Sequence, residues 1–239
     1  MADSPSPSPP AMRLIDGPAT APATVVLAHG AGAPMDSPFM AAIASGLAER
    51  GWRVVRFEFP YMARQRLTGR KSAPDALPKL LESFRAEAAL AAGTGAGPLF
   101  IGGKSLGGRV ASLLVDELAA AGVRGCLCLG YPFHPPGKPL QTRTQHLAAL
   151  ATPTLILQGE RDPFGRREEV ETYPLSPRVR LEWIPSGDHG FKPTRASGRS
   201  EADNWALAVE RADRFCRERL EDLQADQRSD ALASADSGI

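Results

Sequence analysis

The segment Gly102–Gly108, with the sequence Gly-Gly-Lys-Ser-Leu-Gly-Gly, constrains the fold of this chain more than any other. A short apolar run at 98–101 precedes it, and a helical pattern at 109–115 follows it. This order predicts a buried strand that turns sharply at Ser105 into a helix. A glycine stands two residues before the serine and another two residues after it, because a serine at positive φ on such a turn leaves no room for β-carbons where strand and helix pass. Ser105 is therefore a candidate nucleophile.

Short apolar runs and helical patterns alternate along the rest of the chain. Runs of apolar and β-branched residues predict further strands at 12–16, 24–28, 52–59, 124–129, 153–158 and 179–184. Helices are predicted from Asp36 or Ser37 to just before Gly51, at 77–92 and at 201–223, whereas 61–74 is expected to be a loop rich in Arg and Lys. The alternation predicts an α/β fold with a mostly parallel central sheet and helices on both faces. The connections are too short to hold a lid domain.

The chain is organised as one domain. No internal repeat or linker divides its 239 residues, and we expect a single domain over residues 11–223. Residues 1–10, which are rich in Ser and Pro, and the polar stretch 224–239 are expected to be disordered tails.

Composition narrows the classes of partner and compartment. A formal net charge of +1 gives no electrostatic argument for nucleic acid or for an anionic membrane, and no apolar run approaches the roughly 20 residues of a membrane span. The N-terminus lacks a secretory pattern, and an odd number of cysteines, three, favours a reducing cytoplasm. Cys126 and Cys128 lie two apart on a predicted strand, and we expect them to be core residues, because no four-ligand set accompanies them. We expect neither a metal nor a cofactor.

A serine hydroxyl needs a base within hydrogen-bond reach to act as a nucleophile at neutral pH. Parallel sheets present functional loops at the carboxyl ends of their strands, and Asp162 and His189 closely follow the last two predicted strands. We expect His189 to take the proton of Ser105 and Asp162 to orient the imidazole. Asp188 is a competing acid, but a residue adjacent to the histidine is poorly placed to reach its Nδ1.

The tetrahedral intermediate of acyl transfer needs two donors aimed at its oxyanion. The backbone N–H of Leu106, at the start of the helix after the nucleophile, is expected to be one. The glycine-rich loop at 29–32, His-Gly-Ala-Gly, follows the strand at 24–28 and is expected to supply the other. We assign this second donor to Ala31.

Four motifs in this order resemble those of the α/β-hydrolase superfamily. They are H-G-A-G at 29–32, G-K-S-L-G at 103–107, G-E-R-D at 159–162 and G-D-H-G at 187–190. The resemblance covers residues 12–220 and is strongest to small, lid-poor members related to dienelactone hydrolases, including sparsely characterised predicted hydrolases that segments 59–62 and 131–136 also resemble. It implies a single-domain α/β-hydrolase fold. Dienelactone hydrolases proper carry cysteine where this chain has Ser105, so the lactone substrate is not implied.

These features predict a serine hydrolase of the carboxylesterase type, which acts on a small ester, thioester or similar acyl substrate. A second hypothesis is a hydrolase-fold binding or scaffold module with weak or no catalysis. A phosphate-binding loop, G-x-x-x-x-G-K-[ST], is disfavoured because its first glycine would fall at position 98, which is Pro98.

Several residues near the motifs are candidates for the substrate pocket, and they are His29, Tyr61, Lys104 and His134. For His29, its place before the oxyanion loop favours a structural hydrogen bond instead. Lys104 binds an acidic group, assists a contact with a partner, or is simply exposed to solvent. The basic residues within 64–71 either meet an anionic substrate group or form a solvated surface. His146 is expected to begin a surface helix.

Overall fold

Seven strands form one sheet in the computed structural model, which describes residues 12–94 and 97–236. The tail expected at 1–10 lies outside the described residues. The strand order is β1-β3-β2-β4-β5-β6-β7, and only β1 runs antiparallel to its neighbour, so the predicted mostly parallel sheet is confirmed. The strands are β1 (Arg13–Asp16), β2 (Thr24–Ala28), β3 (Arg53–Phe57), β4 (Leu99–Lys104), β5 (Val123–Leu129), β6 (Thr154–Gly159) and β7 (Val179–Ile184).

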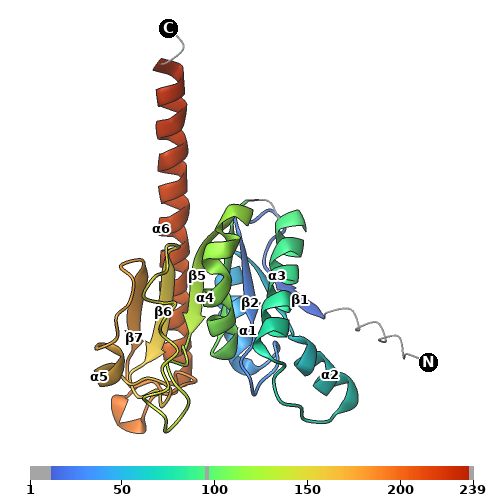
Figure 1. Cartoon of the computed structure of the whole chain (residues 1–239), viewed down its shortest axis with the longest axis vertical. Helices are drawn as coiled ribbons and strands as arrows, with labels where there is room; N and C mark the ends of the chain where they lie inside the picture. Colours follow the sequence, from blue (N-terminus) through green and yellow to red (C-terminus); the bar gives the residue numbers. More distant parts are fainter. Residues whose placement is uncertain (1–11, 95–96, 237–239) are drawn as a thin grey trace, which may run out of the picture.

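Helices cover both faces of this sheet (Figure 1). On one face, α1 (Pro38–Ala48) and α6 (Glu201–Asp236) share an apolar core, and on the other α3 (Leu77–Thr94) and α4 (Leu106–Leu118) share a second one. The strand β2 serves both cores, because successive side chains of a strand point to opposite faces. This double burial explains why its sequence is a continuous apolar run.

Residues 61–74 were expected to be a loop, but 61–68 are helical. The helix α2 (Pro60–Thr68) begins with a proline in its first turn and ends at Gly69, whose φ is 67°. Proline fits a first helical turn because its missing N–H has no partner there in any case, and glycine adopts the left-handed conformation at a helix end freely. Three shorter helices also differ from expectation, the 3₁₀ turns Ala119–Ala121 and Arg195–Ser197 and α5 (Arg167–Val170).

The connection between β5 and β6 consists of turns and bends at 130–153, where a crossover helix would be usual. It begins at the carboxyl end of β5, beside the turn after β4. Within the described ranges no lid domain is inserted between the strands, which agrees with the expected lid-poor fold.

The last helix, α6, continues to Asp236, whereas a disordered tail was expected from residue 224 (Figure 1). Residues 224–236 contain neither glycine nor proline and include four alanines, so nothing in them stops a helix that is already formed. The final turns extend beyond the sheet, and residues 237–239 lie outside the described part. No helix in the described ranges is both long and apolar enough to cross a membrane.

Candidate active site

The turn between β4 and α4 holds Ser105 in a strained conformation. Its φ of 50° and ψ of −108° give the positive φ that the motif predicts. A β-carbon on Gly103 would lie 2.2 Å from the carbonyl oxygen of Ala28, and one on Gly107 would lie 2.4 Å from the same oxygen. Both distances are far below van der Waals contact, so this turn requires glycine on either side of the serine.

His189 and Asp162 meet at the same edge of the sheet. His189 Nδ1 lies 2.7 Å from Asp162 Oδ2, and the Asp162 side chain is fully buried. The other carboxylate oxygen of Asp162 accepts a hydrogen bond of 2.9 Å from the Phe164 N–H, and the Phe164 ring lies 4.3 Å from the imidazole centroid. With the Nδ1 proton donated to the carboxylate, Nε2 is left as the basic nitrogen.

Asp188, the competing acid, has a different set of partners. Its Oδ1 accepts hydrogen bonds from the N–H groups of Gly190 and Lys192, at 2.8 and 3.0 Å. The carboxylate therefore shapes the turn that carries His189. Of the two candidate acids, Asp162 is the one that contacts the imidazole.

Lys104 lies between the nucleophile and the base. Its Nζ donates a hydrogen bond to the backbone carbonyl of His189 and sits 5.3 and 5.7 Å from the ring centroids of Phe39 and Phe191. Gly130 follows β5 with a φ of 66°, and a β-carbon there would lie 2.6 Å from this Nζ and 3.0 Å from the His189 carbonyl oxygen, so this position favours glycine. Burial lowers the pKa of Lys104 to about 8, although the charges of two nearby aspartates oppose the shift. Its ammonium group thus faces the base-bearing turn.

No hydrogen bond joins Ser105 Oγ to the imidazole of His189 in this structure, although both residues belong to its described part. Ser105 follows β4, and His189 follows β7. Lys104, the residue before Ser105, reaches the turn of His189 through its hydrogen bond to the His189 carbonyl, and Gly130, which follows β5, lies beside this contact.

His29 and Tyr61 support the glycine-rich loop from behind. The Nδ1–H of His29 donates to the Gly30 carbonyl at 2.7 Å, and its Nε2 accepts from the Phe59 N–H at 3.1 Å. The Tyr61 hydroxyl lies 3.1 Å from the carbonyl oxygen of Ala31, to which it donates. Both side chains are fully buried, and burial lowers the pKa of His29, which is consistent with a neutral ring. His29 and Tyr61, which the sequence suggested as candidates for the substrate pocket, therefore make hydrogen bonds to the backbone.

The loop also lies against the nucleophile. A β-carbon on Gly30 would be 3.7 Å from Ser105 Cβ. Across the described residues, no carbonyl accepts a hydrogen bond from the N–H of Ala31 or of Leu106, the two candidate oxyanion donors. Both amides are thus available to a ligand beside Ser105.

His134 and two residues of the basic segment 64–71 are engaged elsewhere. His134 is buried, with Nδ1 2.8 Å from the Pro135 carbonyl and Nε2 3.2 Å from Glu169. Two of the basic residues are paired with carboxylates, Arg66 with Glu58 and Asp36, and Arg64 with Asp75.

Three aromatic side chains near the base were missed by the sequence analysis, Phe39, Phe164 and Phe191. Phe191 directly follows the motif that carries His189, and Phe164 lies two residues after Asp162, so their position in the sequence was an available signal. Phe39 lies on α1, far away in sequence, and only the tertiary fold brings it to Lys104.

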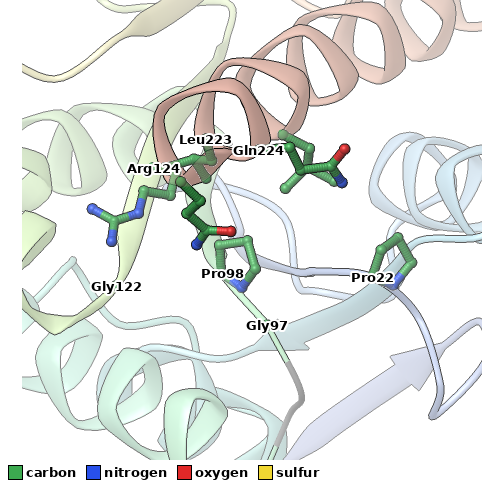
Figure 2. A pocket seen from close by; sticks show the side chains of 9 residues that line it. Pro22, Gly97, Pro98, Gly122, Arg124, Leu223 and Gln224 are labelled. Carbon is green, nitrogen blue, oxygen red and sulfur yellow. The ribbon is translucent and has the colours of Figure 1, made fainter. Parts of the chain in front are cut away.

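A separate cavity of about 420 Å³ lies at the opposite, amino end of β4 and β5, under α6 (Figure 2). None of the candidate site residues lines it. Its lining comprises Pro22, Gly97, Pro98, Gly122, Arg124, Leu220, Leu223, Gln224 and Gln227. In the described ranges, no group of three or more His, Cys, Asp or Glu residues is arranged to hold a metal ion.

Comparisons with known proteins identify a matching family and solved structures of similar fold. Residues 21–217 match a family model described as an alpha/beta hydrolase domain. Est1E from Butyrivibrio proteoclasticus, solved with ferulic acid bound, is 15% identical with a TM-score of 0.66, and the match covers 88% of this chain and 96% of that one. A dienelactone hydrolase from Anabaena variabilis is 22% identical with a TM-score of 0.63, covering 83% and 88%. A lid-less α/β serine hydrolase from Xanthomonas campestris is 22% identical with a TM-score of 0.58, covering 86% and 90%.

Proposed function

The chain belongs to the alpha/beta-hydrolase family, and on this premise we propose that it is a serine hydrolase that cleaves a small ester, thioester or similar acyl bond through an acyl-enzyme on Ser105. One observation carries the proposal. The imidazole of His189 is held by the buried carboxylate of Asp162 at the same sheet edge where Ser105 adopts a strained turn. Strain is retained at functional sites when the surrounding structure enforces it.

In the proposed reaction, His189 Nε2 takes the proton of Ser105 Oγ as the oxygen attacks the acyl carbon. The tetrahedral intermediate collapses when the bond to the leaving group breaks, and the imidazolium gives the proton to that group. A water molecule, deprotonated by the same nitrogen, then attacks the acyl carbon. The bond to Ser105 Oγ breaks, Oγ takes the proton back from the imidazolium, and the acid is released. Asp162 keeps Nδ1 protonated and stabilises the imidazolium in both halves of the cycle.

The N–H groups of Ala31 and Leu106 are the proposed oxyanion donors. Leu106 is the first residue of α4, and a helix N-terminus favours negative charge. The hydroxyl of Tyr61 fixes the Ala31 carbonyl, and the loop that bears the amide stays beside the nucleophile. Two such donors contribute only as the carbonyl oxygen gains charge, so they lower the barrier rather than tighten substrate binding.

The choice of an acyl substrate of the carboxylesterase type rests on the serine nucleophile and on the esterases and serine hydrolases among the structural neighbours. A cytoplasmic location is proposed because all three cysteines are buried and free.

A fluorophosphonate probe tests the proposal directly, because it reacts only with a serine that is activated as a nucleophile. Wild-type protein is expected to be labelled, Ser105→Ala is expected to be unlabelled, and the exposed Ser229→Ala on α6 serves as the matched control. Native, folded wild-type protein that resists the probe and fails to hydrolyse p-nitrophenyl acetate would favour the binding-module hypothesis.

A further inference from the structure

The turn that carries the base, residues 185–191, is held largely by side chains from other segments. Each of its backbone carbonyls accepts a hydrogen bond. Most of the donors are side chains, and they belong to Lys104, Arg161, Asn204 and Trp205. Water can satisfy the carbonyls of a surface loop, so donors supplied by side chains indicate that the path of this turn is fixed.

The backbone of this turn is strained at two positions. Ser186 has a φ of 54° and Phe191 a φ of 68°. Among the described residues, Ser105 is the only other residue besides glycine with a positive φ. Residues with a side chain rarely adopt this conformation, and it persists where the surrounding structure enforces it. The turn therefore depends on outside contacts to keep the conformation in which His189 meets Asp162.

Asn204 joins the two ends of the turn. It lies in the first turn of α6, and its side chain is fully buried. Its Nδ2 donates to the Pro185 carbonyl at 3.0 Å and to the Phe191 carbonyl at 2.8 Å. Its Oδ1 accepts a hydrogen bond of 2.7 Å from Arg199 Nε. One side chain thus connects the residue where the turn begins with the residue where it ends.

The carboxamide group suits this position for a chemical reason. Both of its N–H groups are used, and its oxygen faces a guanidinium that can only donate. This set of partners also fixes which way the amide points. A carboxylate has no proton to give to the two carbonyls, and a hydroxyl group has only one. Aspartate and serine are therefore incomplete substitutes for Asn204.

The residues beside the base are held in succession. Lys104 Nζ donates to the carbonyl of His189, Trp205 Nε1 donates to that of Gly190 at 3.0 Å, and Asn204 holds that of Phe191. Two of these three donors come from adjacent residues of α6. The start of this helix therefore fixes the backbone that directly follows the base.

We propose that Asn204 is a positioning residue for the base, which holds the turn at 185–191 so that the imidazole of His189 keeps its hydrogen bond to Asp162 and presents Nε2 for proton transfer. This inference rests on the proposed function. Asn204 acts through the backbone at both ends of the turn, and small misplacement of a catalytic group slows the chemical step. A purely structural Asn204 would attach α6 to the turn without any effect on the base.

A kinetic comparison tests the positioning role. Asn204→Ser can hold only one of the two carbonyls, and its kcat for p-nitrophenyl acetate is expected to fall about tenfold or more while KM stays within about twofold. Ser176→Ala is the matched control, because it removes a buried side-chain hydrogen bond of 2.6 Å to the Leu150 carbonyl at the amino end of the sheet. This control is expected to lose stability and keep the wild-type kcat.

Both variants are measured at a temperature at which circular dichroism shows them to be folded. Asn204→Asp, which keeps the volume of the side chain and an acceptor for Arg199, is the second variant and is expected to lose kcat as well. A folded Asn204 variant whose kcat is within twofold of wild type overturns the proposal. Failure of both Asn204 variants to fold also overturns it, because Asn204 then serves the fold as a whole.

The tautomer of the base gives a readout that does not depend on catalysis. Histidine-selective ¹⁵N labelling reports which ring nitrogen carries the proton, and the signal of His189 is assigned by its loss in His189→Gln. Wild type is expected to show the Nδ1–H tautomer, because Nδ1 faces Asp162. Asn204→Ser is expected to give mixed tautomers or a broadened signal at His189. The other histidine rings have partners of their own and serve as internal references.

One of these reference rings is His146. It was expected to begin a surface helix but lies half-buried in a turn, with Nε2 2.9 Å from Ser112 Oγ. If wild type hydrolyses no ester, the proposed function fails while the spectrum still tests Asn204. An unchanged His189 signal in folded Asn204→Ser overturns the positioning role. Equal changes in all the histidine rings overturn it as well, because they show a general loss of structure.

Discussion

Lys104 Nζ donates a hydrogen bond to the backbone carbonyl of His189, so the residue before the nucleophile is tied to the residue that carries the base. The contact spans β4 and the turn after β7, two segments that are far apart in sequence. It fixes a backbone atom of the turn, while Asp162 fixes the imidazole itself. Lys104 is therefore a positioning residue in the proposed mechanism.

Replacing Lys104 with methionine is expected to lower kcat for p-nitrophenyl acetate by about tenfold with a smaller change in KM, because small misplacement of a catalytic group reduces the rate of the chemical step. Methionine keeps the contacts with the Phe39 and Phe191 rings but cannot donate to the carbonyl. Lys192→Met, on the exposed side of the same turn, is the control. Unchanged kcat in Lys104→Met would show that the turn holds its geometry without the lysine.

The buried ammonium of Lys104 also predicts a pH dependence of stability. Its pKa in the folded protein is about 8, below the ordinary value of 10.5. Between these two values the unfolded chain binds a proton that the folded chain does not, so stability from this group rises with pH across that window. The Tm of wild type minus that of Lys104→Met is therefore expected to increase from pH 7 to pH 10. A difference that stays constant or falls contradicts a lowered folded-state pKa.

The two aspartates near the base should differ strongly on substitution. Asp162→Asn keeps the shape of the side chain but no longer stabilises the imidazolium, and a loss of about 10⁴-fold in kcat is expected by analogy with other serine hydrolases. Asp188→Ala removes hydrogen bonds to Gly190 and Lys192 and is expected to be milder. Steady-state hydrolysis of p-nitrophenyl acetate measures both, and the opposite ranking would reassign the acid.

The motifs at the strand ends could be recognised in the sequence because a parallel sheet brings the carboxyl ends of its parallel strands to one edge. Ser105, Asp162 and His189 each stand within a few residues of such an end, so short local patterns sufficed to select them. The roles of Tyr61 and Lys104 were not readable, because their partners are backbone carbonyls supplied by distant segments.

Two further features could not be predicted from local sequence patterns, the pairing of charged side chains and the residue at which the last helix ends. A basic stretch looks alike whether its arginines are free or paired, and only the fold shows that Arg66 is held by Glu58. The helix α6 continues past residue 224 because an established helix extends through residues that would not start one alone.

The glycines of the nucleophile turn should be intolerant of a single methyl group. A β-carbon on Gly107 would lie 2.4 Å from the Ala28 carbonyl oxygen and 2.8 Å from that of His29, so relief would require the backbone itself to move. Gly107→Ala is expected to lower the free energy of unfolding by about 3 kcal/mol or more, within the range of severe steric substitutions. Gly93→Ala, in the helix α3 with open space around it, is expected to be neutral or stabilising. Urea denaturation of both variants measures the difference.

Tyr61→Phe tests whether the glycine-rich loop acts in catalysis. The variant loses the hydrogen bond to the Ala31 carbonyl but keeps the ring that packs against His29. Loss of one buried hydrogen bond is expected to cost about 1 kcal/mol of stability. If the Ala31 amide stabilises the oxyanion, kcat falls by about tenfold or more while KM changes little, because the amide acts mainly on the charged intermediate. Tyr173→Phe, whose hydroxyl makes no hydrogen bond to the described residues, is the control. A change confined to KM would instead place the loop in ground-state binding of the substrate.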